Sequence, residues 1–514
     1  MAQSGYDALM AHIAELNDLL NAISVLKWDA RTQMPPGGAI TRGNQLATLS
    51  KLANSHFTGD TTARLLDTAE AEVAQEADDS YRLRAVRQTR QAYEVSKRIP
   101  AELIGRKAAL APVSEQVWAE AKANNDFASF KPYLQQMVDL VKQQAEEVGY
   151  ADHPFDALVF EYEPAVNAVR LKTIFEQLKA GLIPLLQAIV AHPRPLERDL
   201  WAMEYPVTQQ KAFALEMAQR FGYDLNRGRM DIAPHPFEIS FTRNDVRITT
   251  RYHKSFFPMA FFGTLHETGH ALYEQGVDPA LTRSPLTTDF LGQYAVGGTS
   301  YGTHESQSRL WENIVGRSRA FWNANFSRMQ NYFPEQTSGV DADLMYRAVN
   351  RVEPSLIRVE ADEVTYNLHI MIRTEIEMGL LDGSFKVDDL PEIWNETMQN
   401  YLGVTPPDDR RGVLQDVHWS GGGFGSFPSY TIGNIMSAQF FEAARGDDPT
   451  MDQTLEKGDY APLLGWLQQN IYRHGRAFSG EELLQRSTGK GLQVEPYLQY
   501  LQSKFVDLYH LPQL

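Results

Sequence analysis

Apolar residues recur at three- and four-residue steps along most of this chain. In residues 6–26 the sequence YDALMAHIAELNDLLNAISVL places its apolar positions on one face of a helix. Pro35 and Pro36 end this segment, because proline breaks a helix. The same period predicts helices in residues 80–99, 130–149, 171–190, 310–329 and 365–379. The chain is therefore expected to be mainly α-helical.

Residues 237–253 follow a different period. Apolar and polar residues alternate on either side of RND at residues 243–245, which is typical of two strands joined by a turn. This small β-sheet would lie just before the helix of residues 261–276, where an exposed strand edge can pair with an extended peptide. No fixed-period repeat or low-complexity linker interrupts the chain. We therefore expect one domain over residues 1–514, with a divided but continuous helical body.

Charge and cysteine content exclude several classes of protein. The 48 basic residues against 65 acidic ones give a net charge of −17, and such a surface repels the phosphates of nucleic acids. An anionic end of a substrate would need dedicated cations for the same reason. The chain has no cysteine, which excludes disulfides and thiolate ligands and leaves His, Asp and Glu to hold any metal ion.

We expect neither a secretory signal peptide in residues 1–20 nor a membrane span. Residues 1–20, MAQSGYDALMAHIAELNDLL, lack the basic-then-apolar order of a secretory leader. No uninterrupted apolar stretch of about 18 residues occurs, so no membrane span is expected. We predict a cytoplasmic protein.

The segment FFGTLHETGHALYEQG, residues 261–276, contains a candidate metal site. His266 and His270 are four residues apart, so a helix places both imidazoles where they can bind one zinc ion. Glu267 lies about 100° further around the helix and can take a proton from the attacking water. Gly269 costs a helix about 1 kcal/mol relative to alanine, which indicates that another element packs closely over it. The alternative is two solvated or core histidines that share a helix face.

A catalytic zinc ion needs a third protein ligand. Tyr273 and Gly276 stand where a metzincin would carry glycine and histidine, so we expect a carboxylate on a later helix. The candidates are Glu274, Glu305, Glu312, Glu353 and Glu360. Glu274 lies one turn beyond His270 on the same helix, where it is poorly placed to complete a tetrahedral site. We favour Glu305, because the loop GGTSYGT before it gives the chain room to fold back.

With these residues in view, the sequence resembles the carboxypeptidase Taq family of metallocarboxypeptidases. Beyond HETGH, the resemblance rests on motifs that occur in the family's order. They are HPF (residues 235–237), DVRIT (245–249), HESQ (304–307), IRVEAD (357–362) and GVLQDVHW (412–419). KWDARTQMPPGG and GGFGSFPSYTIGN also look like family segments, so the resemblance covers essentially the whole chain.

The resemblance implies a nearly all-helical fold divided by a deep active-site cleft, similar to that of angiotensin-converting enzyme and neurolysin. It also implies a homodimer that removes single residues from peptide C-termini with broad specificity. In this family the glutamate of HES-Q completes the metal site, which supports Glu305 independently of the loop argument.

Two arginines are candidates for binding the free C-terminus of a peptide, because a planar guanidinium makes paired hydrogen bonds to a carboxylate. Arg247 shares a strand face with Asp245, and the family uses this segment and the HPF motif, which begins at His235, to close one end of the groove. Arg358 is the other candidate. Asp362 is expected to face the same way as Arg358 and to orient a ligand histidine. The alternatives are a surface ladder at the first site and an ordinary ion pair at the second.

His418 and Tyr430 are the candidate donors to the oxyanion that forms when water attacks the scissile carbonyl. A histidine beside a tryptophan is more often a packed structural residue, and that alternative stays open for His418. The family pattern leads us to expect a tyrosine where Ser426 stands, so the role of that phenol would pass to Tyr430.

Together these residues predict a metal-dependent carboxypeptidase that acts on peptides. It would hold one metal ion per chain, with zinc first and cobalt or manganese as alternatives. A metal-dependent endopeptidase or dipeptidyl carboxypeptidase with the same metal site is the nearest competing hypothesis. A helical binding protein with an inactive site is the other. Nucleic acids and membranes are not expected as partners.

Overall fold

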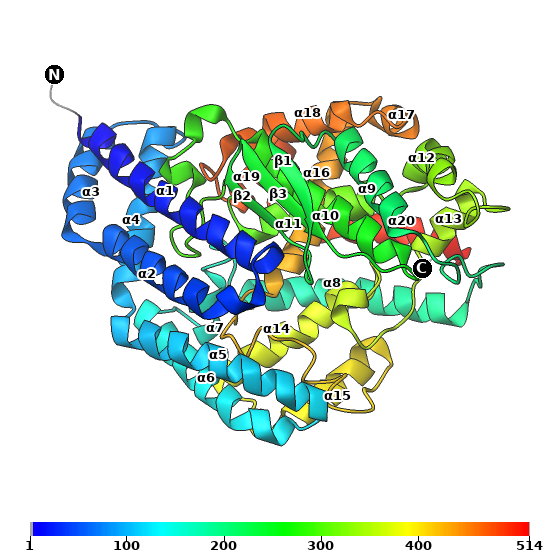
Figure 1. Ribbon diagram of the computed structural model, residues 1–514, viewed down its shortest axis with the longest axis horizontal. Coiled ribbons are helices and arrows are strands. Elements are labelled where there is room, and N and C mark those ends of the chain that lie inside the picture. Colours follow the sequence, from blue (N-terminus) through cyan, green and yellow to red (C-terminus); the bar gives the residue numbers. More distant parts are fainter. Residues whose placement is uncertain (1–3, 513–514) are drawn as a thin grey trace. The chain divides into compact units, whose positions relative to one another are not determined.

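The computed structural model describes residues 4–512 and shows a mainly helical protein with one small β-sheet (Figure 1). The chain divides into two compact units, each assembled from separate segments. Unit 1 comprises Met1–Ser96, Leu196–Val349 and Met436–Leu492, and unit 2 comprises Lys97–Pro195, Asn350–Ile435 and Gln493–Leu514. The predicted fold class is confirmed, while the single domain over residues 1–514 stays a prediction.

Unit 1 holds the sheet and the helices packed around it. Its helices are α1 (Gly5–Thr32), α2 (Ala39–Thr58), α3 (Asp60–Val73), α4 (Tyr81–Arg98), α9 (Val207–Phe221), α10 (Phe257–Gly276), α11 (Tyr301–Arg309), α12 (Arg319–Tyr332), α13 (Ala342–Val349), α17 (Met451–Glu456), α18 (Ala461–Asn470) and α19 (Gly480–Thr488). Its strands are β1 (Gly228–Ile232), β2 (Glu238–Thr242) and β3 (Asp245–Thr250). α4 ends just past the boundary of the unit.

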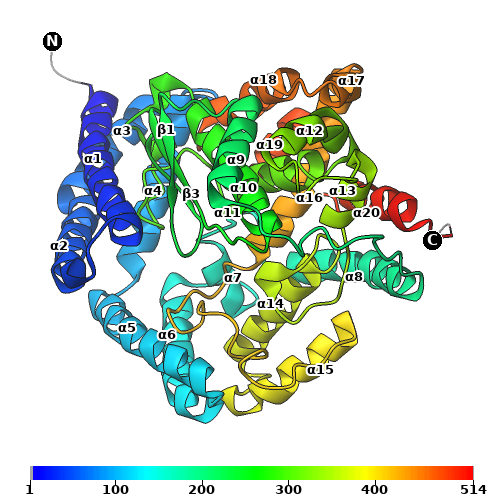
Figure 2. The ribbon, with the colours of Figure 1, turned by 45° about the vertical axis from the view of Figure 1, so that its right-hand side comes forward.

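Unit 2 contains helices and no strand among its described residues. These helices are α5 (Ala101–Asn124), α6 (Phe127–Val148), α7 (Pro154–Val159), α8 (Ala168–Ala191), α14 (Tyr366–Asp382), α15 (Leu390–Leu402) and α20 (Glu495–Tyr509). α16 (Pro428–Asp447) begins in unit 2 and ends in unit 1. Figure 2 shows α5 and α6 side by side, and α14 is buried on nearly all sides.

The sheet of unit 1 has the strand order β1-β3-β2. β1 runs parallel to β3, with Arg229 opposite Arg247, and β2 runs antiparallel to β3, with Ile239 opposite Arg247. The predicted pair of strands within residues 237–253 is confirmed as β2 and β3. The sequence did not predict β1, because this strand is only partly buried and its alternation is limited to two apolar residues, Met230 and Ile232.

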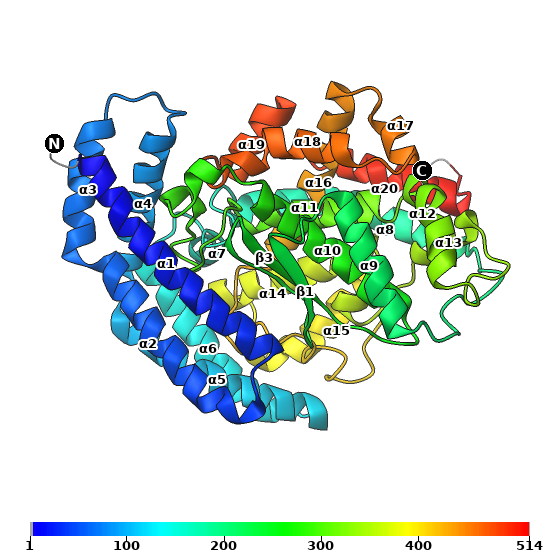
Figure 3. The same ribbon diagram turned by 45° about the horizontal axis from the view of Figure 1, so that its top comes forward.

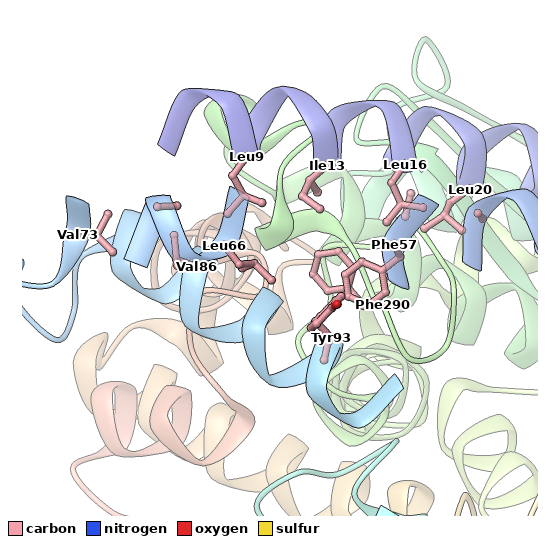
Figure 4. Packing of buried hydrophobic residues seen from close by; sticks show 14 of the residues in the cluster. Leu9, Ile13, Leu16, Leu20, Phe57, Leu66, Val73, Val86, Tyr93 and Phe290 are labelled. Carbon is pink, nitrogen blue, oxygen red and sulfur yellow. The ribbon is translucent and has the colours of Figure 1, made fainter. Parts of the chain in front are cut away.

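α1 covers a hydrophobic cluster in unit 1 (Figure 4). Its N-terminus is capped by Ser4, whose hydroxyl accepts a hydrogen bond from the Asp7 amide at 3.1 Å. Its buried apolar residues recur at the spacing of one helix face, as residues 9, 13, 16 and 20. They pack against Phe57, Leu66, Val73, Val86, Tyr93 and Phe290. This cluster joins α1 to α2, α3 and α4.

The sheet lies between α1 and α10, as Figure 3 shows. Trp28 of α1 belongs to a buried cluster with Phe237, Ile239 and Phe241 on one side of the sheet. On the other side, Ser240 donates a hydrogen bond to Glu274 of α10 at 3.4 Å. The strands therefore support the helix that carries the HETGH segment.

The prediction of one continuous helix over residues 310–329 is wrong. Residues Leu310–Val315 form a wide π-helical turn, and α12 begins only at Arg319. A Cβ on Gly316 would lie 2.6 Å from Leu265 Cδ1 of α10, so a packing contact bends the chain here. Ser318 then caps α12 by accepting a hydrogen bond from the Phe321 amide at 3.0 Å.

α8 is long and apolar enough to cross a membrane by length and composition alone, and no other helix of residues 4–512 is. Its buried residues, among them Leu171, Phe175, Leu178 and Leu182, face the interior of unit 2. Because a core helix passes the same test, this feature is weak evidence for a membrane span.

Candidate active site

α10 and α11 pack in direct backbone contact at Gly269. A Cβ at this position would lie 2.4 Å from the carbonyl oxygen of Gln307 and 2.6 Å from Ser308 Cα. Only glycine permits such an approach. The close packing inferred from the cost of Gly269 is confirmed, and it brings the HESQ segment over the HETGH segment.

This contact brings His266, His270 and Glu305 together. Glu305 Oε2 lies 3.6 Å from His266 Nε2 and 3.4 Å from His270 Nε2. Ligand atoms at the usual distance of about 2.1 Å from a tetrahedral zinc ion are about 3.4 Å apart. Two imidazole nitrogens and one carboxylate oxygen are the donors of a catalytic zinc site. The side chains present therefore fit a divalent metal ion.

A carboxylate outside the triad of His266, His270 and Glu305 orients His266. Glu312 Oε2 lies 3.0 Å from His266 Nδ1 and accepts a hydrogen bond from its N–H, which leaves Nε2 free to bind a metal ion. Arg317 holds the other oxygen of Glu312 at 3.2 Å. Burial lowers the pKa of His266, but Glu305 and Glu312 outweigh this effect and raise it. A metal ion must therefore displace a proton from His266 at acidic pH.

A chain of hydrogen bonds orients His270. Its Nδ1 lies 2.5 Å from His304 Nδ1, and His304 Nε2 lies 2.9 Å from Glu274 Oε1. Glu274 also accepts hydrogen bonds from the amides of Gly297 and Gly298, so His304 donates to Glu274 and accepts from His270. Burial lowers the pKa of His270 to about 3. The imidazole is therefore neutral, with its Nε2 lone pair facing Glu305.

Glu305 is held as a carboxylate by its neighbours. It is 5% exposed, and Arg309 donates to its Oε1 at 2.7 Å, while Ser308 donates to its Oε2 at 3.1 Å. Burial alone would raise the pKa of Glu305, but Arg309, His266 and His270 hold it well below its usual range. The side chain is thus ionised at neutral pH, as a metal ligand must be.

Glu267 follows His266 on α10 and is not one of the clustered donors. It is 6% exposed, and burial raises the pKa of its carboxyl to about 7. Glu305 and Glu312 add to this rise, while His266 and Arg31 oppose it. A carboxyl with a pKa near 7 can both accept and return a proton at neutral pH.

The remaining candidate ligands lie elsewhere. Glu274 serves the His304 contact, and Glu312 holds His266 from behind. Glu353 pairs with Arg351, and Glu360 is exposed in a short 3-10 turn of unit 2. Of the five glutamates weighed from the sequence, only Glu305 joins the two histidines.

Arg247 has its charge neutralised within its own strand. It donates to both oxygens of Asp245 at 2.8 Å, and its guanidinium stacks over Trp28 at 4.4 Å. Thr249 of the same strand exchanges hydrogen bonds with the backbone of Phe237, which ties the DVRIT and HPF motifs together. His235 lies exposed in the loop between β1 and β2. Arg247 and Thr249 therefore have partners within the protein, whereas the side chain of His235 is exposed.

Arg358 lies in a different environment, within unit 2. It is 6% exposed and donates to Asp416 at 3.1 Å and to the Tyr366 hydroxyl at 3.2 Å, while its Nε is buried without a hydrogen-bond partner. Arg373, fully buried, also contacts Asp416. Burial would raise the pKa of Asp416, but the two guanidinium groups hold it well below its usual range. One carboxylate thus stands between two arginines.

The hypothesis that Asp362 orients a ligand histidine is wrong, and so is the alternative of an ion pair between Asp362 and Arg358. Asp362 accepts hydrogen bonds from the amides of Glu353, Val364 and Thr365 and therefore caps its own segment. Asp416 pairs with Arg358, and Glu312 holds the ligand histidine.

His418 lies next to the arginine cluster of unit 2. Its Nδ1 is 3.7 Å from Asp416 Oδ1, and burial lowers the pKa of the imidazole to about 4, so it is neutral at pH 7. Tyr430 lies in the first turn of α16, with the Arg358 guanidinium 5.4 Å from its ring centre. Ser426 donates to the carbonyl of Gly423 at 3.2 Å and supports the turn before α16.

Sequence reasoning missed several residues of these sites, among them Arg373 and Asp416 of the arginine cluster. His304 precedes Glu305 directly in the HESQ motif, and Arg309 follows Glu305 at the four-residue spacing of a helical ion pair. Both signals were present in the sequence. Glu377 is fully buried and accepts hydrogen bonds from Trp419 Nε1 and from the Gly425 amide, each at 2.9 Å. Its role depends on contacts remote in sequence, which no local pattern indicates.

Comparisons with known proteins cover almost the whole chain. A family model described as carboxypeptidase Taq (M32) metallopeptidase matches residues 8–505. The chain is 40% identical over 516 residues to thermostable carboxypeptidase 1 of Thermus thermophilus, covering 99% of each chain. It is 38% identical over 490 residues to carboxypeptidase 1 of Bacillus subtilis, covering 95% of this chain and 96% of that one.

Solved structures agree with these matches. The crystal structure of an M32 carboxypeptidase from Deinococcus radiodurans R1 superposes with a TM-score of 0.93 at 40% identity and covers 99% of this chain and 100% of that one. Trypanosoma cruzi metallocarboxypeptidase 1 superposes with a TM-score of 0.91 at 33% identity, covering 98% and 100%. Because the family model and these relatives align almost end to end with it, this chain belongs to the carboxypeptidase Taq (M32) metallopeptidase family and is a metallocarboxypeptidase.

Proposed function

We propose that this protein removes single residues from the C-termini of peptides with broad specificity, using one zinc ion held by His266, His270 and Glu305. Cobalt and manganese are the alternative metals, since a His/His/Glu donor set accepts them. The protein is further proposed to be a cytoplasmic homodimer. The family membership and the donor geometry support the metal-dependent hydrolysis, and the arginine cluster of unit 2 supports the restriction to C-termini.

The charge of that cluster is the observation that carries the exopeptidase proposal. Among residues 4–512, Arg358 and Arg373 share one ion-pair partner, Asp416, and burial raises the pKa of the neighbouring Glu377 to about 8. Burial also keeps His418 neutral. The cluster therefore has one positive charge in excess, and an unpaired buried charge is costly. A peptide C-terminal carboxylate would neutralise it.

Arg358 is the proposed carboxylate ligand in preference to Arg247. Its Nε is buried without a hydrogen-bond partner, so the hydrogen-bonding capacity of this guanidinium is not fully used within the protein. Arg247 already makes a paired contact with Asp245 and would have to give it up. We propose that His235 and Arg247, in the hydrogen-bonded HPF and DVRIT motifs, bind or border the substrate. In this proposal neither residue binds the C-terminal carboxylate.

The catalytic roles follow from protonation states. A divalent metal ion in the triad would polarise the scissile carbonyl and lower the pKa of the attacking water. Glu267, with a pKa near 7, accepts the proton of this water and passes it to the leaving amine. Neutral His418, and Tyr430 in place of the expected tyrosine at Ser426, are the proposed hydrogen-bond donors to the oxyanion.

The substrate proposal is tested with one N-blocked peptide prepared with a free and with an amidated C-terminus. Mass spectrometry over time should show stepwise loss of single residues from the free peptide and no cleavage of the amide. Internal fragments or dipeptide losses would favour the endopeptidase or dipeptidyl carboxypeptidase alternative. If the metal is bound and neither peptide is cut, the helical binding protein is the better hypothesis.

The choice between the two arginines is tested with Arg358→Gln and its matched control Arg247→Gln. Loss of a charged, paired contact to the carboxylate should raise KM for the free peptide about 10–100-fold in Arg358→Gln, since such hydrogen bonds contribute about 1.5–3 kcal/mol. Arg247→Gln should change KM much less. The reverse order would assign the carboxylate to Arg247.

The general-base role is tested with Glu267→Gln, which keeps the shape of the side chain. We expect kcat to fall about 10²–10⁴-fold, the usual contribution of a positioned base, while the metal content by mass spectrometry stays unchanged. Activity near the wild-type level with full metal content would remove Glu267 from the mechanism.

A further inference from the structure

A second group of metal-binding side chains lies in unit 1, away from the HETGH segment. His12 and Glu15 lie on α1 and His56 lies on α2. One nitrogen of each imidazole and one carboxylate oxygen lie within 4.8 Å of one another. Both histidines are half-buried and Glu15 is exposed, so solvent and ions have access. Nothing in the proposed peptidase chemistry uses these residues.

Hydrogen bonds determine which nitrogen of each imidazole is free. His56 Nε2 lies 3.0 Å from the backbone carbonyl of His12, so this nitrogen carries a proton and donates it. Thr62 Oγ1 donates to the carbonyl of His56 at 3.0 Å, so its lone pair accepts from His12 Nε2 at 2.8 Å. In the neutral imidazoles both protons are on Nε2, and both Nδ1 atoms carry a lone pair.

This arrangement is typical of metal ligands. A histidine that binds a metal ion usually donates its second N–H to an oxygen of the protein, which fixes the tautomer and the ring orientation. Here a buried hydroxyl and a backbone carbonyl play that part for His12 and His56. Glu15 follows His12 by one helical turn and adds a charged oxygen. Two nitrogens and one carboxylate oxygen suit zinc and similar divalent transition metals.

The ring geometry differs from that of the HETGH site in one respect. The imidazoles of His12 and His56 stack, with centroids 4.0 Å apart and 21° between their planes. Those of His266 and His270 stand at 83°, as converging ligands do. Binding at the first pair must therefore include a limited rotation of the rings about their Nε2 hydrogen bonds, which moves the Nδ1 atoms toward Glu15. Since that rotation costs free energy, this site should fill after the HETGH site.

We propose that His12, Glu15 and His56 form a second, weaker site for a divalent transition metal ion, which links α1 to α2. The linked helices carry the hydrophobic cluster, where Ile13 and Phe57 directly follow the two histidines. A ligand that binds only the folded state stabilises it. Occupation of this site therefore raises the melting temperature of the protein without entering the catalytic step.

The test is a zinc titration of the metal-loaded enzyme, with bound metal measured by mass spectrometry after equilibrium dialysis. Wild type should take up a second equivalent at micromolar to millimolar free zinc. Glu15→Gln and His56→Gln should each lose this equivalent and the accompanying rise in melting temperature. Both variants should keep the first equivalent and wild-type peptidase activity. The matched control is His192→Gln, which changes an exposed histidine outside the group.

The outcomes separate a built site from adventitious binding. A second equivalent that persists in either Glu15→Gln or His56→Gln would overturn the proposal, because surface groups would then hold the ion. The absence of a second equivalent in wild type up to millimolar zinc would overturn it as well. If His56→Gln fails to fold, Glu15→Gln decides the question, since Glu15 is exposed and its replacement leaves the stacked rings in place.

Discussion

Hydrogen bonds to Nδ1 decide which nitrogen of each of the two HETGH histidines remains for a metal ion. His266 donates to Glu312, and His270 donates to His304, so both Nε2 atoms face Glu305. The Nδ1 hydrogen-bond partners of His266 and His270 differ in kind. His266 meets a carboxylate directly, whereas His270 reaches Glu274 only through His304.

Replacement of Glu312 should weaken the metal site without removing a ligand. In Glu312→Gln the carboxylate that fixes His266 becomes an amide, and loss of such a contact lowers metal affinity about 10–100-fold. Glu274→Gln acts one residue further from the metal and should lower affinity less. Glu305→Gln removes a ligand and should lower it most. Competition with a chromophoric chelator measures all three affinities, and an equal loss in the Glu274 and Glu312 variants would contradict the proposed order.

Local spacing was sufficient to predict the two histidines but insufficient to assign roles to the glutamates. His266 and His270 lie on one face because the period of a helix is fixed. Glu312 was weighed from the sequence as a ligand, yet it stands behind His266 because a π-helical turn at Leu310–Val315 redirects it. Such turns depend on packing against α10 and leave no repeat in the sequence.

At the scale of elements, the contact between α10 and α11 brings Glu305, the proposed third ligand, to the two histidines. Gly269 lies where the two backbones meet, so any side chain there would push α11 away. Gly263 lies on the same helix in open surroundings, since a Cβ there would meet only Thr250 Oγ1 at 3.9 Å. Alanine substitutions at Gly269 and Gly263 therefore distinguish the cost of overpacking from the gain in helix propensity.

Gly269→Ala should therefore destabilise the protein by about 1–3 kcal/mol, the usual cost of overpacking, and lower its affinity for zinc. Gly263→Ala should raise stability by about 0.5–1 kcal/mol, because alanine favours a helix over glycine. Thermal unfolding and a zinc titration measure both effects. A stable Gly269→Ala variant with unchanged zinc affinity would show that Glu305 does not depend on this contact.

Elements with a clear apolar period were predictable, and elements set by remote contacts were not. Most predicted helices occur near their expected ends, as α4 and α6 illustrate. β1 pairs in parallel with β3 and has little buried surface, so neither its partner nor its burial is visible locally. The break before α12 follows from the contact of Gly316 with Leu265.

At the scale of the whole molecule, each unit is assembled from segments far apart in the chain. The metal donors belong to unit 1 and the arginine cluster to unit 2. The sequence alone left Arg247 and Arg358 as equal candidates, because it cannot show that one is paired with Asp245 and the other shares Asp416 with Arg373. These tertiary contacts support the proposed choice of Arg358.

The net charge of −17 affects substrates before they reach either unit. A strongly acidic protein repels anionic peptides over a distance set by the Debye length, about 30 Å at 0.01 M salt and about 8 Å at 0.15 M. The excess positive charge at Arg358 is buried and acts at short range, so salt screens it less. Long-range repulsion and local attraction should therefore respond differently to ionic strength.

We expect kcat/KM for a peptide rich in Asp and Glu to rise several-fold as salt increases from about 0.01 to 0.15 M, because screening removes the repulsion. A Lys-rich peptide with the same C-terminal residue should show the opposite trend, and a neutral peptide should change little. The shared C-terminal residue keeps the proposed contact with Arg358 constant. Any difference in salt dependence among the three peptides therefore reports the long-range electrostatic field of the protein. Equal salt dependence for all three peptides would mean that the overall charge plays no part in substrate selection.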